Sequence, residues 1–354
     1  MDSVGAQETR GSGSRRGVAP ALTLVVLAPF IAEVLSGSTR LSYIFVFIPE
    51  MMVWGCGALV IRELVRRWGG GVTSMLTFGL ALAVAQEFLI QQTSLAPMPW
   101  ITGPIYGREW GVNWPFFLFL LGYESIWVVL VPVQIVELLF PDRRNGPWLR
   151  IRGLVVAGLT FLLGALLAWF LWTQVARPKK FHVPPYHPSS LLLGIGAAAS
   201  VLLVICAYAL RRRKQTSPDH QRTPRAWVVG LAVLILASGW YVLITLVFAP
   251  TLQPHFSFWF VMAAGVVWAV IAYALLRNWS SADGWSDLHR WAAAFAATLV
   301  CMLAGFGGSS AWPRMDLIAK IVMNVVAFLG LVWLGVDIWR RNRDTAPHRS
   351  TPSS

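Results

Sequence analysis

The stretch LALAVAQEFLIQQTS, residues 80–94, begins as an apolar helix and then places four polar side chains where lipid is expected: Gln86, Glu87, Gln91 and Gln92. Steps of three and four residues bring Gln86, Glu87 and Gln91 onto one broad helix face. A carboxylate at the centre of a bilayer costs about 2.5–3.5 kcal/mol on insertion scales, so this face must meet a polar neighbour. Two interpretations stay open: a polar zipper between helices, or a functional site that uses the charge of Glu87.

The composition of the whole chain is that of a membrane protein. Of its 354 residues, 56% are hydrophobic and only 13% are charged, and the mean hydropathy is +0.60. Soluble domains carry about 25% charged residues. Apolar runs of about 20 residues, long enough to cross ~30 Å of hydrocarbon, recur throughout. They predict an all-α, polytopic integral membrane bundle of about ten transmembrane helices, near residues 18–37, 41–61, 72–92, 114–137, 153–175, 190–210, 226–249, 256–276, 290–308 and 316–339.

The positions of Lys and Arg predict the orientation, because basic residues beside short loops are retained on the cytoplasmic side. Most of the 29 basic residues fall between alternate spans, as in the RRRK run at 211–214. We therefore expect a multi-pass protein of the cell (inner) membrane with both termini, and residue 216, in the cytoplasm and residue 184 outside. The net charge of +13 then reflects topology and attraction to anionic head groups of the lipid bilayer, with no nucleic-acid partner.

Acidic residues divide the chain into unequal halves. Five glutamates lie in or beside the first four spans, namely Glu33, Glu50, Glu87, Glu124 and Glu137, and the last six spans contain none. We expect a disordered basic tail at 1–17, a four-helix half with the polar site at 18–152, a six-helix scaffold half at 153–339 and a second basic tail at 340–354. Within the scaffold, the spacing of Asp316 to Lys320 and of Asp337 to Arg340 and Arg341 predicts pairing near helix ends.

Four of these glutamates lie at depths that call for a shared polar environment. At 1.5 Å per residue, Glu50 and Glu124 fall near the middle of their spans, and Glu33 and Glu87 fall in the outer half. Burial and repulsion between like charges favour the protonated form of a carboxyl group. A polar pocket open to the outside is the simplest arrangement that hydrates all four.

Prolines accompany three of the acids. Pro29 precedes Glu33, Pro49 precedes Glu50, and Pro132 follows Glu124. Each proline removes one helical hydrogen bond and frees the carbonyl four residues earlier, which predicts free carbonyls at Val25, Phe45 and Val128. Kinked helices with an acid and a free carbonyl form ion or solute sites in transporters. The alternative is that prolines are simply common in membrane helices.

The loop TSLAPMPWITGPIYGREWGVNW, residues 93–114, is expected to lack regular structure because of its prolines and glycines. Its one cation, Arg108, either closes the acidic pocket as a lid residue or pairs with Glu109. The three cysteines, Cys56, Cys206 and Cys301, fall in spans without metal-ligand spacing and are expected to be packed thiols. We expect no metal site and no cofactor.

The run AQEFLIQQ resembles the first motif of the glutamic intramembrane proteases related to CAAX-processing enzymes. Those proteins place paired glutamates followed by an arginine on one helix, with histidines on later helices. The matching positions here are Gln86, Glu87 and Gln91, so one of three residues is kept. More broadly, PFIAEVLSGST, ALVIRELVRRWG, YGREWGVNW and VELLFPDRR are similar to a family of uncharacterised bacterial multi-pass proteins, over roughly residues 29–150. The members of that family have no established activity, so the resemblance implies the topology and leaves the function open.

Three functions are compatible with this sequence. The leading one is binding or translocation of a small polar or cationic solute, with proton coupling, through Glu33, Glu50, Glu87, Glu124, Gln86, Gln91 and Arg108. The second is a degenerate CAAX-protease-like hydrolase with Glu87 as general base. An enzyme is less favoured because every histidine falls in a loop or at a span end. The third is a scaffold or assembly factor whose polar face holds a partner membrane helix.

Overall fold

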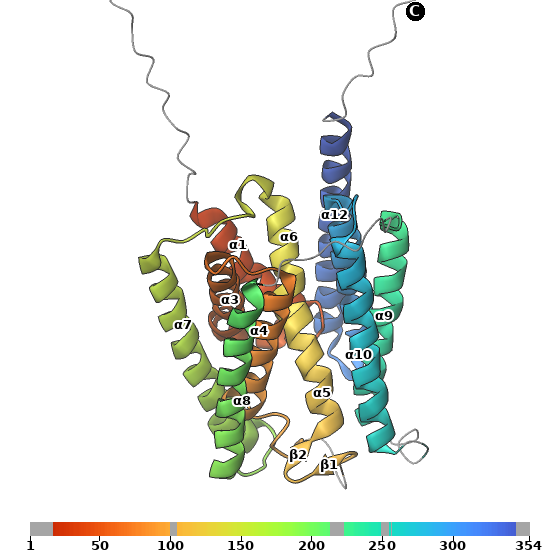
Figure 1. The fold of residues 1–354 in the computed structure, drawn as a ribbon. Helices are drawn as coiled ribbons and strands as arrows, with labels where there is room; N and C mark the ends of the chain where they lie inside the picture. The colour runs from red at the N-terminus through yellow and green to blue at the C-terminus, as the bar shows by residue number, and fades with distance from the viewer. Residues whose placement is uncertain (1–16, 100–104, 213–222, 249–254, 256, 345–354) are drawn as a thin grey trace, which may run out of the picture.

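The computed structural model describes residues 17–99, 105–212, 223–248, 255 and 257–344. Over these residues the protein is almost entirely helical, with one short hairpin (Figure 1). Eight helices are long and apolar enough to cross a membrane, and the shorter helices Val18–Val34 and α11 lie in the same bundle. The expected all-α bundle is confirmed. By helix length and composition the chain is a multi-pass membrane protein.

The helical order follows the expected spans closely. The α-helices are α1 (Val18–Pro29), α2 (Phe47–Glu50), α3 (Cys56–Arg67), α4 (Val72–Ala85), α5 (Trp114–Tyr123), α6 (Val131–Leu139), α7 (Ile151–Trp169), α8 (Ser190–Ala209), α9 (Ala226–Phe248), α10 (Phe258–Ser281), α11 (Asp287–Ala304) and α12 (Arg314–Asp344). Short 3₁₀ helices cover Leu41–Val46, Pro141–Arg143, Leu210–Arg212 and Ser309–Ala311. Five π turns extend or join these helices, at Phe30–Val34, Met51–Gly55, Gln86–Ile90, Glu124–Leu130 and Phe170–Lys180.

Several helices run beyond the apolar limits that the sequence suggested. The expected span 153–175 is part of a helix that continues to Lys180, and the expected span 316–339 continues to Asp344. Long basic side chains allow this, because their stems lie along apolar surface while the charge reaches water. Hydropathy therefore located the spans but not their helical ends.

Connections alternate between two ends of the bundle. The loop from α6 to α7 lies at one end, and the hairpin of β1 (Arg108–Glu109) and β2 (Val112–Asn113) lies at the other (Figure 1). We call these the arginine-rich end and the hairpin end. The hairpin corrects the expectation that residues 93–114 lack regular structure. Gly107 and Gly111 supply the positive φ angles, 68° and 79°, that its turns need.

A continuous hydrophobic cluster runs through both halves of the chain. It includes Leu24 of α1, Trp127 before α6, Cys301 of α11 and Leu334 of α12. The indole of Trp127 also donates to the carbonyl of Ala297 at 2.8 Å. Helices α8, α10 and α12 instead expose apolar side chains along most of their length, which suits contact with lipid. The six later helices thus pack directly on those that carry the acids.

One buried ion network closes the arginine-rich end. Arg62 and Glu63 are fully buried, and Arg62 Nε lies 3.3 Å from Glu137 Oε1. Arg66 Nη2 lies 2.7 Å from Glu137 Oε2. Glu63 accepts the backbone amide of Trp148 at 2.7 Å, and the Arg62 guanidinium stacks 3.6 Å from the centre of the Trp148 ring. Glu137 is therefore a structural ion-pair partner, which separates it from the other four glutamates.

Candidate functional site

Each of the four remaining glutamates lies at a π turn. Glu33 is in Phe30–Val34, Glu50 directly precedes Met51–Gly55, Glu87 is in Gln86–Ile90, and Glu124 begins Glu124–Leu130. π helices account for well under 1% of residues in proteins and concentrate at functional sites, because the extra residue interrupts regular helical bonding. Four coincidences on four helices mark this region as the candidate site. The fifth π turn, Phe170–Lys180, contains no glutamate.

The carbonyl freed by Pro29 is covered by a close helix contact. Pro29 has no amide to bond the carbonyl of Val25, as the sequence indicated. In the structure this carbonyl lies against Gly55 of the neighbouring span, where a Cβ atom would collide with it. Only glycine permits the approach. The contact brings the helix of Glu33 beside the helix of Glu50.

Thr39 joins Glu33 to Glu50. Its backbone amide donates to the carbonyl of Glu33 at 2.9 Å, and its hydroxyl donates to Oε1 of Glu50. Glu33 also interacts electrostatically with Glu50. The second oxygen of Glu50, Oε2, is buried and has no hydrogen-bond partner among the described residues. The two acids thus form a pair in which Oε2 of Glu50 is a buried acceptor available to a ligand.

Glu87 fastens the chain reversal that ends its helix. Its Oε2 accepts three hydrogen bonds, from the Thr93 hydroxyl at 2.7 Å and from the amide and hydroxyl of Ser94 at 2.8 and 2.6 Å. The reversal itself uses Gln92 in the left-handed region, at φ 59°, with its amide bonded to the carbonyl of Gln86. Glu87 therefore has a local structural role in addition to any function.

Glu124 and Gln86 carry buried polar atoms that have no hydrogen-bond partner among the described residues. Oε2 of Glu124 and both side-chain atoms of Gln86 lack any hydrogen bond, although Gln86 is only 1% exposed. Glu124 interacts electrostatically with both Glu87 and Glu33. The four acids are therefore connected in the order Glu87, Glu124, Glu33, Glu50. A polar zipper would require hydrogen bonds from the Gln86 amide, and no described residue makes one with it. Gln91, also expected at the site, is partly exposed.

Helices of the second half complete the walls around Glu33. Cys301 Sγ of α11 lies 3.5 Å from the carbonyl of Ile31, inside the π turn of Glu33. Lys320 of α12 is buried, and its ammonium donates to the carbonyls of Leu35 and, at 3.3 Å, Met302. These carbonyls end two helices, and their dipoles favour a cation there. The sequence did not indicate that Cys301 and Lys320 belong to the site, because only tertiary packing brings them to the acids.

The expected pairing of Asp316 with Lys320 is wrong. Asp316 instead accepts the amide and hydroxyl of Ser42 at 2.9 and 2.8 Å, and no ion pair joins it to Lys320 in the part of the chain described. Ser42 lies far away in sequence, so spacing along one helix could not reveal it. The other expected pair is confirmed, since Asp337 lies 2.8 Å from Arg341.

Arg108 connects the hairpin to the loop after Glu87. Its Nη2 donates to the carbonyl of Leu95, while Nη1 is buried without a partner. Among the described residues no ion pair joins Arg108 to Glu109, so the simple surface pairing is not what the fold uses. Arg108 thus lies beside the Glu87 reversal rather than in open solvent.

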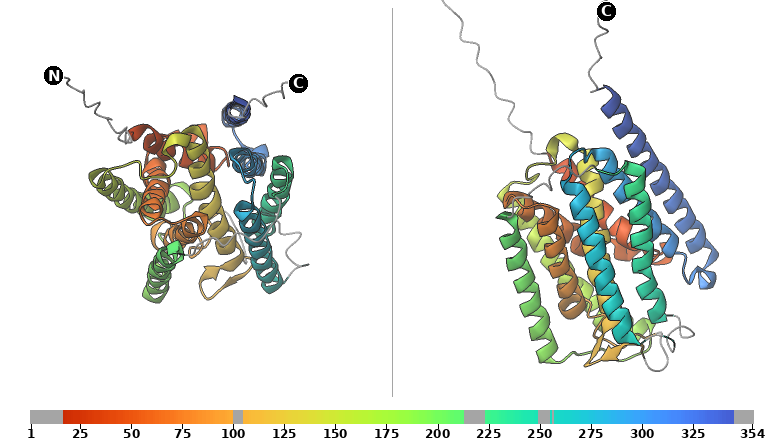
Figure 2. Two further views of the ribbon diagram at one scale, coloured as in Figure 1. Left: turned by 45° about the horizontal axis from the view of Figure 1, so that its top comes forward. Right: turned by 45° about the vertical axis from the view of Figure 1, so that its right-hand side comes forward.

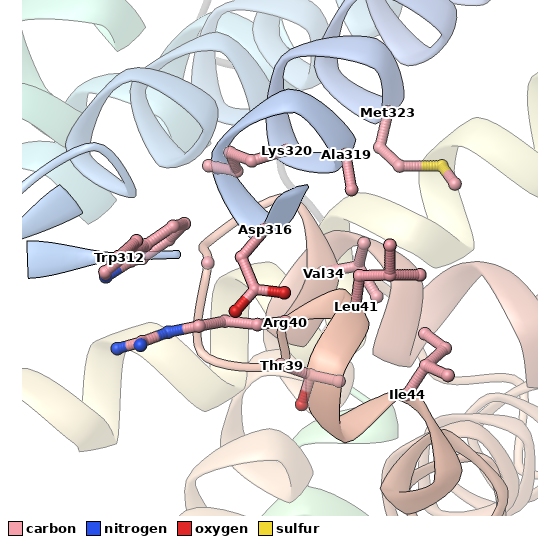
Figure 3. A pocket seen from close by; sticks show the side chains of 11 residues that line it. Val34, Thr39, Arg40, Leu41, Ile44, Trp312, Asp316, Ala319, Lys320 and Met323 are labelled. Atoms are coloured by element: carbon pink, nitrogen blue, oxygen red, sulfur yellow. The ribbon is translucent and has the colours of Figure 1, made fainter. Parts of the chain in front are cut away.

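A cavity of about 30 Å³ lies between α12 and the segment that precedes α2 (Figure 3). That volume holds roughly two water molecules. Its lining includes Val34, Thr39 and Arg40 on one side and Asp316 and Lys320 on the other. The cavity reaches Thr39, which bonds Glu50, and none of the four acids lines it directly. This cavity is therefore not the outward-facing polar pocket that the sequence predicted around all four acids.

The side chains of the candidate site that could bind a metal ion do not gather at one point. Among the described residues, no three side chains of His, Cys, Asp or Glu lie close enough to hold a metal ion. His289 caps α11 by bonding Ser286 and the carbonyl of Pro224. The sequence matches no family model, and no significant match was found among curated proteins or among solved structures. Function must therefore be inferred from the site itself.

Proposed function

We propose that this protein binds and translocates a small polar or cationic solute, with proton coupling, through Glu33, Glu50, Glu87 and Glu124. One observation carries the proposal: these acids are inside a membrane bundle, and none takes part in an ion pair of the described residues. Carboxyl groups at membrane depth are costly and occur on ion, proton and substrate pathways. Glu137, by contrast, has two arginines.

The serial arrangement of the acids supports proton coupling. Neighbouring carboxyl groups repel each other when ionised, so carboxyl groups that lie close together can exchange protons as a set. A cation that binds among these carboxyl groups displaces protons from them. The unpartnered oxygens of Glu50 and Glu124 and the unpartnered amide of Gln86 supply the acceptors and donors that a polar solute needs. Interrupted helices with free backbone groups provide such sites in known transporters.

The other two functions receive less support from the geometry. A hydrolase would need Glu87 free to activate water, and three hydrogen bonds from Thr93 and Ser94 already occupy its Oε2. A partner helix would need an exposed polar face, and Gln86 and Glu87 are each 1% exposed because this chain's own helices cover them. Solute binding is the function that uses the unpartnered atoms.

We also propose that the arginine-rich end faces the cytoplasm of the cell in which the protein is made. Arg62, Arg66 and Arg67 end α3 there, and Arg150 and Arg152 begin α7. Retention of basic segments on the cytoplasmic side orients most multi-pass proteins.

Thermal unfolding of purified protein against a panel of polar and cationic solutes tests the proposed function. A solute at about 100 times its Kd stabilises the folded state by about 2.7 kcal/mol. We expect Glu50→Gln and Glu124→Gln to abolish the shift in melting temperature and the accompanying proton release. Glu109→Gln, an exposed acid of the hairpin, is the matched control and should keep both. Full retention of both signals in the two buried variants would remove the acids from the function.

A further inference from the structure

The first turns of α12 clamp a short segment that leads from Glu33 to Glu50. Asp316 binds Ser42 through two hydrogen bonds, of 2.9 and 2.8 Å, and Lys320 binds the carbonyl of Leu35. Asp316 and Lys320 are four residues apart and share one helix face. Both are buried, at 3% and 4% exposure. α12 therefore holds both ends of the segment 35–42.

The residues between these two attachments also depend on the connection before α12. Gly37, at φ 82°, lies against the Trp312 ring and the Gly305 carbonyl so closely that no side chain fits. The Arg40 guanidinium lies 4.5 Å from the centre of the Trp312 ring. Segment 35–42 is thus shaped by the second half of the chain, although it leads to acids of the first half.

Thr39 lies in the middle of the clamped segment. It touches the cavity under α12 and donates its hydroxyl to Glu50, while its amide binds the Glu33 carbonyl (Figure 3). Thr39 thus lines the cavity with one part and contacts both acids with another. Movement of this one residue would connect the cavity to the acids.

We propose that α12 is the gate of the acidic site, and that Asp316 and Lys320 are positioning residues that hold Thr39 over Glu50. Release of Ser42 from Asp316 opens the cavity onto Glu50 and admits water and protons. This inference rests on the proposed function for the importance of Glu50, but access to the cavity can be measured whether or not a solute binds.

The position of α12 suits a moving element. It lies at the periphery of the bundle and extends past the other helices at the arginine-rich end (Figure 2). Its outer surface consists largely of exposed apolar residues, among them Val325, Leu329 and Trp333. Such a surface stays in contact with lipid when the helix shifts, so the movement exposes no apolar area to water. The polar attachments at Asp316 and Lys320 are what the gate must break.

Alkylation of a cysteine placed in the cavity tests the gate. We would introduce Val34→Cys, since Val34 is buried and lines the cavity, and follow its reaction with a small thiol reagent in the full chain. Asp316→Ala removes both bonds to Ser42, and we expect labelling to accelerate by about tenfold or more, the effect of losing one charge-assisted hydrogen bond. Asp316→Asn keeps an acceptor for the Ser42 amide and offers a donor to the Ser42 hydroxyl oxygen, so it should restore slow labelling. Asp337→Ala, at the far end of α12, is the matched control and should change nothing.

Two further measurements separate a gate from a general loss of structure. Buried Cys56 reports global loosening, and its labelling should stay slow in Asp316→Ala. Hydrogen–deuterium exchange of the Glu50 carboxyl, identified in infrared spectra by its loss in Glu50→Gln, should accelerate together with Val34→Cys labelling. Equal labelling of Val34→Cys in all variants, parallel labelling of Cys56, or unchanged exchange at Glu50 would each overturn the gate. Failure of every solute to bind, with these results intact, would overturn only the proposed function.

Discussion

At the scale of single residues, glutamates of this protein have two different uses. Glu63 is buried with arginines and backbone amides and attaches the loop between α6 and α7 to α3, while buried Glu137 pairs with arginines and attaches α6 to α3. Glu50 and Glu124 are buried, and each has a carboxyl oxygen without a hydrogen-bond partner in the described part of the chain. Ion-paired acids stabilise a fold once both charges are present, whereas unpartnered acids weaken it. The difference in partners separates structural acids from candidate functional ones.

Arg62 should be the most sensitive residue of the arginine-rich end. Replacement in Arg62→Met leaves buried Glu63 with only Arg67, at 3.5 Å, and buried Glu137 with only Arg66, and we expect a loss of about 3–5 kcal/mol in unfolding free energy. Arg150→Met removes an exposed arginine and should change stability by less than about 0.5 kcal/mol. Unfolding by denaturing detergent in mixed micelles measures both. Equal stability of the two variants would show that the buried network does not stabilise the fold.

At the scale of elements, the π turns set the distance between the helices that carry the acids. α4 and the Glu124–Leu130 turn approach so closely that a Cβ atom on Gly79 would lie 2.9 Å from the Cα atom of Ser125. Small residues at such contacts let membrane helices pack backbone to backbone. This contact keeps the helix of Glu87 within electrostatic range of Glu124.

Gly79→Ala should therefore separate two helices of the site. We expect a loss of about 1–3 kcal/mol in stability from overpacking, together with weaker solute binding. Gly158→Ala on α7 is the matched control, since a Cβ atom there meets nothing within 4 Å. That change should be neutral or stabilising by up to about 1 kcal/mol, because alanine favours helix. A similar stability for both variants would mean that the contact adjusts freely, and the π turn would not fix the spacing.

At the scale of the whole molecule, both halves of the chain build one core and one site. The cluster that contains Trp127 also contains Cys301 and Leu334, from α11 and α12. Two residues of the expected scaffold half reach this site. Cys301 contacts the π turn that carries Glu33, and Lys320 contacts Leu35, the residue that follows that turn. Mutations far along the sequence are therefore expected to affect the acids.

The alternation of the two ends predicts a specific membrane orientation. An epitope inserted at residue 184 should be accessible from outside the cell, and one at residue 216, which lies outside the described residues, should be accessible only from the cytoplasm. Protease digestion of intact cells and of inside-out vesicles measures both positions. Cleavage at 184 from the cytoplasmic side, or at 216 from outside, would reverse the orientation while leaving the fold unchanged.

Hydropathy and charge determined a large part of this protein. Apolar runs identified each of the eight helices that are long and apolar enough to cross a membrane among the described residues, because the hydrocarbon thickness sets a length that local sequence must satisfy. The unequal distribution of glutamates identified Glu33, Glu50, Glu87 and Glu124, and Pro29 indicated the free carbonyl at Val25. These features depend on residue type and local spacing, which a sequence displays directly.

Tertiary structure alone decided how these residues are used. Glu137 and Glu124 are both glutamates of one span, yet only Glu137 meets arginines, because α3 ends beside it. Asp316 bonds Ser42 rather than Lys320, and Thr39 joins Glu33 to Glu50, through contacts between segments far apart in the chain. Hydropathy reports how deep a side chain lies in the membrane. The packing of helices against one another decides which neighbour it meets there, and that neighbour determines whether a buried acid stabilises the fold or remains available to a solute.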